Sequence, residues 1–513
     1  MKFLAALLVM ACAGTAAAQP GPAITASSFS QPLAAAVFTS ALGFIAPRTL
    51  DPVTVPQLTI WGLRGLTALD PALVPELRED SIRLSASDHL VFTGAIPSDQ
   101  SPAAWGELAA IVAQAAAAQS DAVRQASTRG VIRSFFDELF NHLDPYSRYE
   151  PPGAADTERE HRSGQAGLGM GIGSRGQQVV AASVIPNSPA DDAGVRAGDP
   201  ILSVDGRTTR GQAAATVAAW IAGAEGTVVK LAWRGRGGRP RREAVTRALV
   251  APETVVAERI GAVLVIRIAA FSRNTDEQFA NALTVGLGER GRVAGVVVDL
   301  RGNRGGLLRQ AVAVVDQVME GGIVAVTAGR NPEASRTWPG GNGPDQAGGR
   351  PIVVLVDGRS ASAAEIMAAA LADSRRAVVV GSSTLGKGLV QTIAPMPDGG
   401  ELFVTWSRVL APLGWPVQGL GLLPQVCTSL GQAMVERQLT DLLAGRQDMA
   451  PALQQHHAAR APLPPAQIVA LRKACPAAEG RDLDLDVANF LLDHPAAYRA
   501  GLLGLEGQGA ARP

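Results

Sequence analysis

The chain has 513 residues, which is enough for about three domains. Lysine plus arginine and aspartate plus glutamate are balanced at 46 each, so the net charge of zero gives no reason to expect nucleic acid or an anionic membrane surface as a partner. Three cysteines without an H-E-x-x-H motif provide no recognisable zinc site. We therefore expect no metal and no other cofactor.

The N-terminus has the pattern of a secretory signal. Lys2 precedes an apolar run, and small residues follow up to Ala18, where an A-x-A site predicts cleavage. Residues 1–18 are too short to span a membrane, and no other stretch reaches about 18 uninterrupted apolar residues, so no integral membrane span is expected. We predict export across the inner membrane to the periplasm. Cys12 leaves a weaker alternative, a lipid-modified lipoprotein anchor.

Residues 19–150 are predicted to form a mostly helical N-terminal region. Leu108–Gln119 lacks helix breakers, and Gly130–Leu139 places apolar residues three and four apart, as an amphipathic helix does. Residues 88–94 have the composition of a strand. The residues before about 100 indicate no function.

A glycine-rich segment at 167–173 opens the next region. Ser188–Gly194 reads as a one-turn helix with serine at the cap, proline at the first helical position and glycine at the exit. With the turn, strand and tight turn of residues 195–206, this resembles a PDZ domain, which we place at 160–250. Such domains bind an extended peptide as an added strand. The resemblance implies that the backbone N–H groups of Leu168, Gly169 and Met170 hold the peptide's terminal carboxylate; the alternative is that the glycines only shape a β-turn.

Apolar strand patterns then alternate with helix patterns. Val263–Ile268 and Val296–Leu300 are predicted to be buried strands, and 275–278 opens a helix between them. This alternation indicates an α/β layer structure. The segment after the second strand, 301–306, contains three glycines, which allow close backbone approach or an ordinary turn.

Ser362 lies between a predicted strand, 352–356, and a predicted helix, 363–372. A hydroxyl at such a junction is exposed beside unpaired backbone N–H groups, which is a common setting for a nucleophile. The segment 362–365, S-A-A-E, also fits a capping box, in which the serine only satisfies the first turn of a helix. This segment alone leaves both interpretations open.

A base for Ser362 has to be found without a nearby histidine, because none occurs between Arg162 and Gln455. Lysine is the other common base for a serine nucleophile, and the nearest one downstream is Lys387, in a glycine-flanked loop. At neutral pH this role requires a lowered pKa, and the apolar neighbours Leu385, Leu389 and Val390 are consistent with the necessary burial.

Several segments, in chain order, resemble the C-terminal processing proteases, also called tail-specific proteases, which are serine peptidases with a Ser-Lys-Gln arrangement. The segments are D-P-Y-S-R-Y at 144–149, D-L-R-G-N-R-G-G-L-L at 299–308, S-A-A-E at 362–365, L-G-K-G-L-V-Q at 385–391 and G-L-G-L-L-P-Q-V at 419–426. The resemblance covers roughly residues 130–426 and implies an α/β serine protease core at 251–426.

The resemblance also implies roles for individual residues. Ser362 corresponds to the nucleophile, Lys387 to its general base and Gln391 to the residue that orients the lysine amine. The N–H of Ala363, with that of Gly305 or Gly306, corresponds to the oxyanion hole. The chain departs from the family pattern at three positions, where serine, phenylalanine and aspartate are replaced by Ala364, Leu385 and Gln425.

Residues 427–513 are predicted to be a helical C-terminal region. Two helical patterns flank Pro462–Pro465, and Asp482–Leu492 could pack on the core or mediate assembly. A disulfide between Cys427 and Cys475 is chemically permitted outside the cytoplasm, but the sequence does not decide whether the two lie close enough.

The predicted fold is an α/β catalytic core, with a mixed sheet and helices, plus a small β-rich PDZ domain and a helical N-terminal region. The predicted function is a serine endopeptidase that captures C-terminal tails of unfolded or tagged proteins and cleaves peptide bonds through an acyl-enzyme. The expected partners are polypeptides with free C-termini; an adaptor or activator protein and a homo-oligomer remain open. One alternative is a catalytically inactive PDZ scaffold or chaperone-like module, and another is a Ser-Lys amidase or esterase acting on small molecules.

Overall fold

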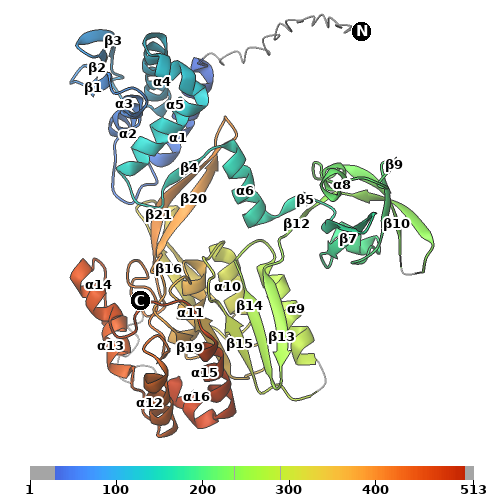
Figure 1. Cartoon of the computed structure of the whole chain (residues 1–513). Coiled ribbons are helices and arrows are strands. Elements are labelled where there is room, and N and C mark those ends of the chain that lie inside the picture. Colours follow the sequence, from blue (N-terminus) through green and yellow to red (C-terminus); the bar gives the residue numbers. More distant parts are fainter. Residues whose placement is uncertain (1–28, 236, 289–290, 342, 503–513) are drawn as a thin grey trace, which may run out of the picture. The chain divides into compact units, whose positions relative to one another are not determined.

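A computed structural model describes residues 29–502 except 236, 289–290 and 342 (Figure 1). The chain divides into two compact units, one made of residues 1–42 and 55–142 and the other of residues 43–54 and 143–513. The predicted signal peptide, including Cys12, lies outside the described residues. None of the described helices combines the length and the apolar character needed to cross a membrane.

The first unit is a helical cluster with a small antiparallel sheet in the order β1-β2-β3. Ser101 caps α4 by accepting the Ala104 N–H, and Pro102 occupies the first turn, as the sequence of a helix start requires. The helices and the strand that we predicted here are present. The elements are α1 (Gln31–Ile45), α2 (Val55–Leu63), α3 (Gly65–Leu69), β1 (Leu73–Leu77), β2 (Ser81–Ala86), β3 (His89–Ala95), α4 (Pro102–Gln119) and α5 (Asp121–Asn141).

The glycine-rich region forms a β-rich module around the buried Trp233. Three small sheets have the orders β6-β7, β11-β10-β8-β9 and β12-β5. Ser188 caps α7 as expected, accepting the Asp191 N–H, with Pro189 at the first helical position. The elements are β5 (Gln165–Gly167), β6 (Met170–Arg175), β7 (Gln178–Val184), α7 (Pro189–Asp192), β8 (Ile201–Val204), β9 (Arg207–Thr208), α8 (Ala214–Ile221), β10 (Val228–Arg234), β11 (Pro240–Thr246) and β12 (Ala248–Val250).

The α/β core contains a six-stranded sheet in the order β13-β14-β15-β18-β19-β22, in which only β13 is antiparallel to its neighbour. The inner strands are continuous apolar runs because helices cover both faces of a parallel sheet. The strands are β13 (Val255–Ile260), β14 (Val263–Ile268), β15 (Gly295–Asp299), β18 (Ile352–Val356), β19 (Ala377–Gly381) and β22 (Val426–Cys427).

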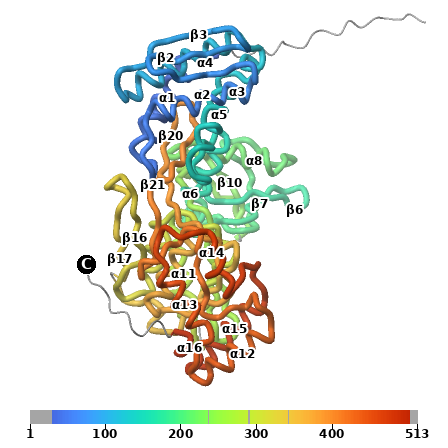
Figure 2. Tube along the Cα trace, turned by 90° about the vertical axis from the view of Figure 1, so that its left-hand side faces the viewer, coloured from blue at the N-terminus to red at the C-terminus, as the bar shows by residue number. Residues whose placement is uncertain are grey.

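Two helical layers cover this sheet. One apolar cluster joins one face to α9 (Thr275–Gly288), α10 (Leu308–Asp316) and α11 (Ala363–Asp373). A second cluster joins the opposite face to α12 (Gln432–Leu443), α15 (Asp482–Asp493) and α16 (Pro495–Gly501), which Figure 2 shows gathered together. The C-terminal region therefore packs on the core, one of the two alternatives that the sequence left open.

A second sheet, in the order β17-β16-β21-β20 with β4 paired to β21, carries the segment that follows Lys387. The remaining helices, α13 and α14, lie in the C-terminal region, where Cys427 and Cys475 form a disulfide. The remaining elements are β4 (Arg148–Glu150), α6 (Pro152–Ser163), β16 (Ile323–Ala328), η1 (Pro332–Ala334), β17 (Arg336–Pro339), β20 (Leu389–Pro395), β21 (Glu401–Leu410), α13 (Ala450–Ala458) and α14 (Pro465–Arg472).

Candidate active site

Ser362 stands between β18 and α11, at the N-cap position of a helix that is buried from Ala363 to Leu371. Its backbone has φ 56° and ψ −118°, which differs from the extended conformation of an ordinary N-cap. A non-glycine residue held in this region costs about 1–3 kcal/mol, and such residues cluster at functional sites. Glu365 Oε2 accepts the Ser362 N–H at 2.8 Å, which is one half of the predicted capping box, whereas the Ser362 side chain makes no capping hydrogen bond. Capping and catalysis are therefore compatible, but capping alone gives no reason for the positive φ.

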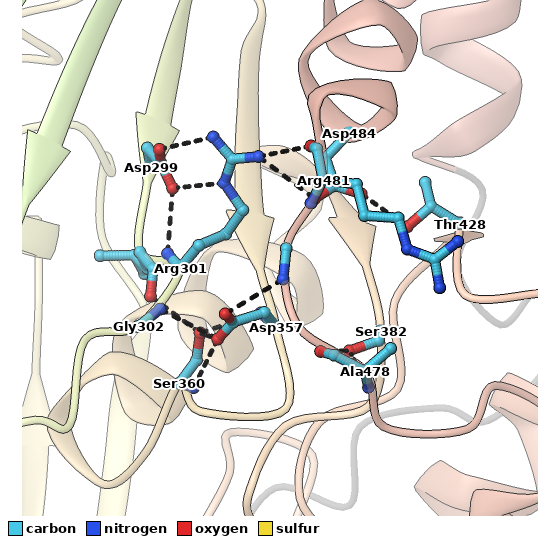
Figure 3. Close-up of polar contacts among 12 residues, drawn as sticks. Asp299, Arg301, Gly302, Asp357, Ser360, Ser382, Thr428, Ala478, Arg481 and Asp484 are labelled. Atoms are coloured by element: carbon cyan, nitrogen blue, oxygen red, sulfur yellow. Dashed lines mark hydrogen bonds and ion pairs between the residues drawn. The ribbon is translucent and has the colours of Figure 1, made fainter.

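The turn before Ser362 is fixed by a buried carboxylate. Asp357 Oδ1 accepts the backbone N–H groups of Ser360 and of Gly302, each at 2.9 Å. The Ser360 hydroxyl donates to the Leu300 carbonyl at 2.8 Å. The turn after β18 is thus joined to the loop after β15, which carries the predicted oxyanion glycines (Figure 3).

Gly305, in that loop, packs directly against Ser362. A Cβ added at Gly305 would lie 2.7 Å from Ser362 Cβ and 3.0 Å from Ala363 N, and its φ of +96° favours glycine. The Gly305 N–H donates to Asn303 Oδ1 at 2.7 Å. Within the described chain, no hydrogen bond is formed by the Gly306 N–H. The structure therefore brings Gly305, Ser362 and Ala363 together, with the Gly305 donor engaged by Asn303.

Glu365 links Ser362 to the loop that carries Lys387. Its fully buried carboxylate accepts the N–H groups of Ser362, Gly386 and Lys387 at 2.8, 2.7 and 2.9 Å, and also the Thr384 hydroxyl. Burial raises the pKa of Glu365, and the four donors oppose that shift. The sequence motif indicated only a helix cap at this position, so the contacts to the lysine loop were missed.

Lys387 follows β19 in the loop that leads to β20. Burial lowers the pKa of the Lys387 amine, and the positive charge of Arg148 lowers it further. The amine nitrogen lies 5.0 Å from the centre of the Tyr146 ring. In the part of the chain that the structure describes, no hydrogen bond joins this amine to Ser362 or Gln391. Of the apolar neighbours expected around the lysine, Leu389 is buried and Val390 is half-buried, whereas the side chain of Leu385 is 47% exposed.

Gln391 lies on β20 and makes its hydrogen bonds elsewhere. Its amide nitrogen donates to the Leu389 carbonyl at 3.1 Å and to the Thr405 hydroxyl at 3.0 Å. The Thr405 hydroxyl in turn donates to Asp144 Oδ1 at 2.6 Å. The D-P-Y-S-R-Y segment at 144–149 therefore contacts both Gln391, through Thr405, and Lys387. Sequence reasoning found this segment but gave it no role.

The predicted peptide-binding loop precedes β6. Gly169 has a φ of +72°, and the carbonyl oxygens of Leu168 and Gly169 accept the N–H groups of Ala190 and Ile185. Among the described residues, β6 pairs only with β7, so its other edge has no partner strand. Met170 begins this strand. The loop thus stands at the start of an open strand edge, where an added strand can form backbone hydrogen bonds.

The site has no feature of a metal centre. Within residues 29–502, apart from the gaps named above, no group of three or more His, Cys, Asp and Glu side chains is arranged to hold a metal ion.

The α/β core with a serine at a strained strand-to-helix turn is the arrangement of a serine hydrolase. Residues 262–428 match the model of peptidase family S41, and residues 180–235 match that of the PDZ domain. The chain is 33% identical over 300 residues to a carboxy-terminal-processing protease of Bartonella bacilliformis, covering 58% of this chain and 69% of the relative. It is 32% identical over 326 residues to a chloroplastic C-terminal processing peptidase of Tetradesmus obliquus, and the match covers 59% of this chain and 68% of the relative.

Among solved structures, the photosystem II D1 C-terminal processing protease matches with 28% sequence identity and a TM-score of 0.36. This match covers 72% of this chain and 92% of that chain. The family-model matches and the two relatives show that the chain belongs to peptidase family S41 and is a serine peptidase with a PDZ domain. The fold class expected from the sequence is confirmed.

Proposed function

We propose that the protein cleaves polypeptides through an acyl-enzyme on Ser362, with Lys387 as general base. The observation that carries this proposal is the positive φ of Ser362 at the start of α11, together with Gly305 packed against its Cβ. Ser362 Oγ attacks the peptide carbonyl, and Lys387 takes the hydroxyl proton and returns it to the leaving amine. Water then hydrolyses the ester.

The lowered pKa of Lys387 supports its role as a base, because an ordinary lysine is almost entirely protonated at neutral pH. The amine lies over the Tyr146 ring and, among the described residues, makes no hydrogen bond with Ser362, so the two side chains must approach each other before the proton is transferred. Hydrogen bonds of a catalytic pair often form only when substrate is bound. We propose that Gln391 orients the amine in that state, after its amide is released from Thr405.

The oxyanion hole is proposed to consist of the Ala363 N–H and one N–H from the 305–306 loop. The Gly306 N–H makes no hydrogen bond within the described chain and is free to donate to the oxyanion, whereas the Gly305 N–H must first be released from Asn303 Oδ1. Each such donor typically contributes about 2.7–4 kcal/mol of barrier reduction.

The substrate is proposed to be the C-terminal tail of an unfolded or tagged polypeptide. The open edge of β6 supports this proposal, since a peptide can add there as a strand while the N–H groups of Leu168, Gly169 and Met170 receive its carboxylate. Export to the periplasm, an adaptor protein and a homo-oligomer stay predictions from the sequence.

The test is cleavage of an unstructured protein by the mature chain. Ser362→Ala and Lys387→Ala should be silent, whereas the matched controls Ser374→Ala, at the other end of α11, and the exposed Lys230→Ala, on β10, should cleave like wild type. Removing the substrate's last residues should raise KM if the PDZ domain captures tails. Equal cleavage by Ser362→Ala and wild type would overturn the proposal, and binding of tails without any cleavage would favour the scaffold alternative.

A further inference from the structure

A short segment of the C-terminal region, residues 472–484, crosses the carboxyl ends of the parallel strands. We call it the C-terminal strap. It lies outside residues 262–428, which match the peptidase family model. It contacts the loops that follow β15, β18 and β19, and Figure 3 shows contacts of this segment with Arg301, Asp357 and Ser382 of those loops. The same loops carry the proposed oxyanion glycines, nucleophile and base.

The first contact is with the turn that precedes Ser362. The Gly358 N–H donates to the Ala478 carbonyl at 2.7 Å, and the Gly480 N–H donates to Asp357 Oδ2 at 3.3 Å. Asp357 is the carboxylate that also holds the N–H groups of Ser360 and Gly302 through its other oxygen. The strap thus completes the set of donors around the residue that shapes the turn.

The second contact is with the loop after β15. Arg301 bridges two carboxylates: its side chain donates to both oxygens of Asp299, at 2.9 and 2.8 Å, and its Nη1 donates to Asp484 Oδ2 at 3.2 Å. Asp484 is 1% exposed and also accepts the Thr428 hydroxyl at 2.6 Å. A Cβ at Gly480 would lie 2.5 Å from Arg301 Cδ, so the strap can approach this closely only with glycine there.

The third contact is with the loop that carries Lys387. Arg472 donates from Nη2 to the Thr384 carbonyl at 2.7 Å and from Nη1 to the Leu420 carbonyl at 2.6 Å. The Ser382 hydroxyl donates to the Ala478 carbonyl at 2.9 Å. The Cys427–Cys475 disulfide ties the beginning of the strap to β22.

These contacts are better suited to positioning the three loops than to stabilising the fold. Burying charges such as Asp484 carries a desolvation cost that an ion pair often fails to recover, so a buried network is weak evidence for stability. The nucleophile, base and oxyanion donors come from three separate loops, and a misplacement of about 1 Å at such a site can cost about 100-fold in rate. A segment that binds all three loops holds them in register.

We propose that Asp484 and Arg472 of the C-terminal strap are positioning residues for catalysis. Asp484 fixes Arg301 and the oxyanion loop, and Arg472 fixes the Thr384 carbonyl and the lysine loop. Neither side chain contacts Ser362, so both act through other residues. This inference rests on the proposed roles of Ser362 and Lys387.

The test compares Asp484→Asn with Asp486→Asn, an exposed aspartate two residues further along α15. Asp484→Asn should lower kcat about 10- to 100-fold with KM changed by less than about 2-fold. Arg472→Met should act in the same direction, and Arg472→Lys should recover part of the rate. Asp486→Asn should match wild type in both constants.

A count of acylated molecules separates positioning from simple loss of structure. If the strap positions the loops, nearly every Asp484→Asn molecule forms an acyl-enzyme, but more slowly than wild type. If Asp484 only stabilises the fold, fewer molecules are active and each acylates at the normal rate, and the proposal fails. Should Asp484→Asn not fold, Thr428→Val and Arg472→Met decide the question, because both leave the Asp484 charge in place.

The assignment of Ser362 as the nucleophile and the role of the strap can be refuted separately. Full activity in Ser362→Ala would refute the assignment of the nucleophile, whatever the strap variants do. A silent Ser362→Ala beside wild-type kcat in Asp484→Asn and Arg472→Met would refute the strap inference alone.

Discussion

Replacing Glu365 by glutamine tests whether one carboxylate holds the nucleophile and the lysine loop together. Glutamine has almost the same shape, but it offers one acceptor oxygen where glutamate offers two. Each oxygen of Glu365 accepts two donors: one binds the N–H groups of Ser362 and Lys387, and the other binds the Thr384 hydroxyl and the Gly386 N–H. The amide nitrogen of the variant would therefore face two buried donors.

The expected cost follows from this count of donors. A buried donor left without a partner costs about 1–3 kcal/mol, so the two together cost about 2–6 kcal/mol. For a core of this size, about 1 kcal/mol lowers the melting temperature by about 2–4 °C, so we expect a decrease of at least about 4 °C. Because the loops of Ser362 and Lys387 lose their common anchor, kcat should fall by about 100-fold or more.

The assay measures kcat, KM and thermal melting for Glu365→Gln beside Glu436→Gln, in which an exposed carboxylate of α12 is changed. The control should behave like wild type. A Glu365→Gln protein that melts within about 1 °C of wild type and keeps its kcat would refute the reasoning.

Three further changes test other parts of the site and the core. Gly305→Ala should lower kcat about 100-fold or more in steady-state kinetics, because the new Cβ would lie 2.7 Å from Ser362 Cβ. An unchanged kcat would contradict this close approach. Arg148→Gln should shift the rising limb of the kcat/KM–pH profile to higher pH, because removing a positive charge raises the pKa of Lys387; an unshifted limb would contradict that assignment. Burial lowers the pKa of His456 to about 3 in the folded protein, whereas in the unfolded chain this histidine takes up a proton near pH 6.5. The free energy of unfolding should therefore be at its full value above about pH 6.5 and should fall between pH 6.5 and pH 3 by up to about 1.4 kcal/mol per pH unit. His456→Gln keeps a donor for the Gly421 carbonyl but cannot take up a proton, so its free energy of unfolding should fall less between pH 6.5 and pH 3 than that of wild type. An equal fall in both proteins, measured by unfolding experiments, would refute the role of His456.

The sheet of the core was predictable because parallel strands buried on both faces are continuous apolar runs. The patterns at 263–268, 296–300 and 352–356 appear as β14, β15 and β18. In the N-terminal unit the pattern of residues 88–94 appears as β3, but β1 and β2 were not predicted. They are short and partly exposed, so their sequences carry a weak signal.

The positions of the site residues were also accessible from motifs, but their partners were not. The sequence places Lys387 and Gln391 near Ser362 in a motif, yet it does not determine side-chain conformation. The cation–π contact of Lys387 with Tyr146 and the hydrogen bond from Gln391 to Thr405 depend on the fold of segments far apart in the chain.

The same limit applies to the C-terminal region. A disulfide between Cys427 and Cys475 requires suitably close Cα atoms, which no spacing in the sequence establishes. The contact of Asp484 with Arg301 joins residues 183 positions apart. Local patterns predicted the helix that begins at Asp482, but not which loop its first turn would hold.

The most direct test of the central claim is the mass of the enzyme during turnover. Acid quenching of wild type with an unstructured substrate, followed by peptide mapping, should find the substrate's N-terminal fragment bound as an ester to the peptide that contains Ser362. The adduct should be absent in Ser362→Ala and should form much more slowly in Lys387→Ala. An adduct on another residue, or cleavage by wild type with no adduct at any time point, would contradict the account.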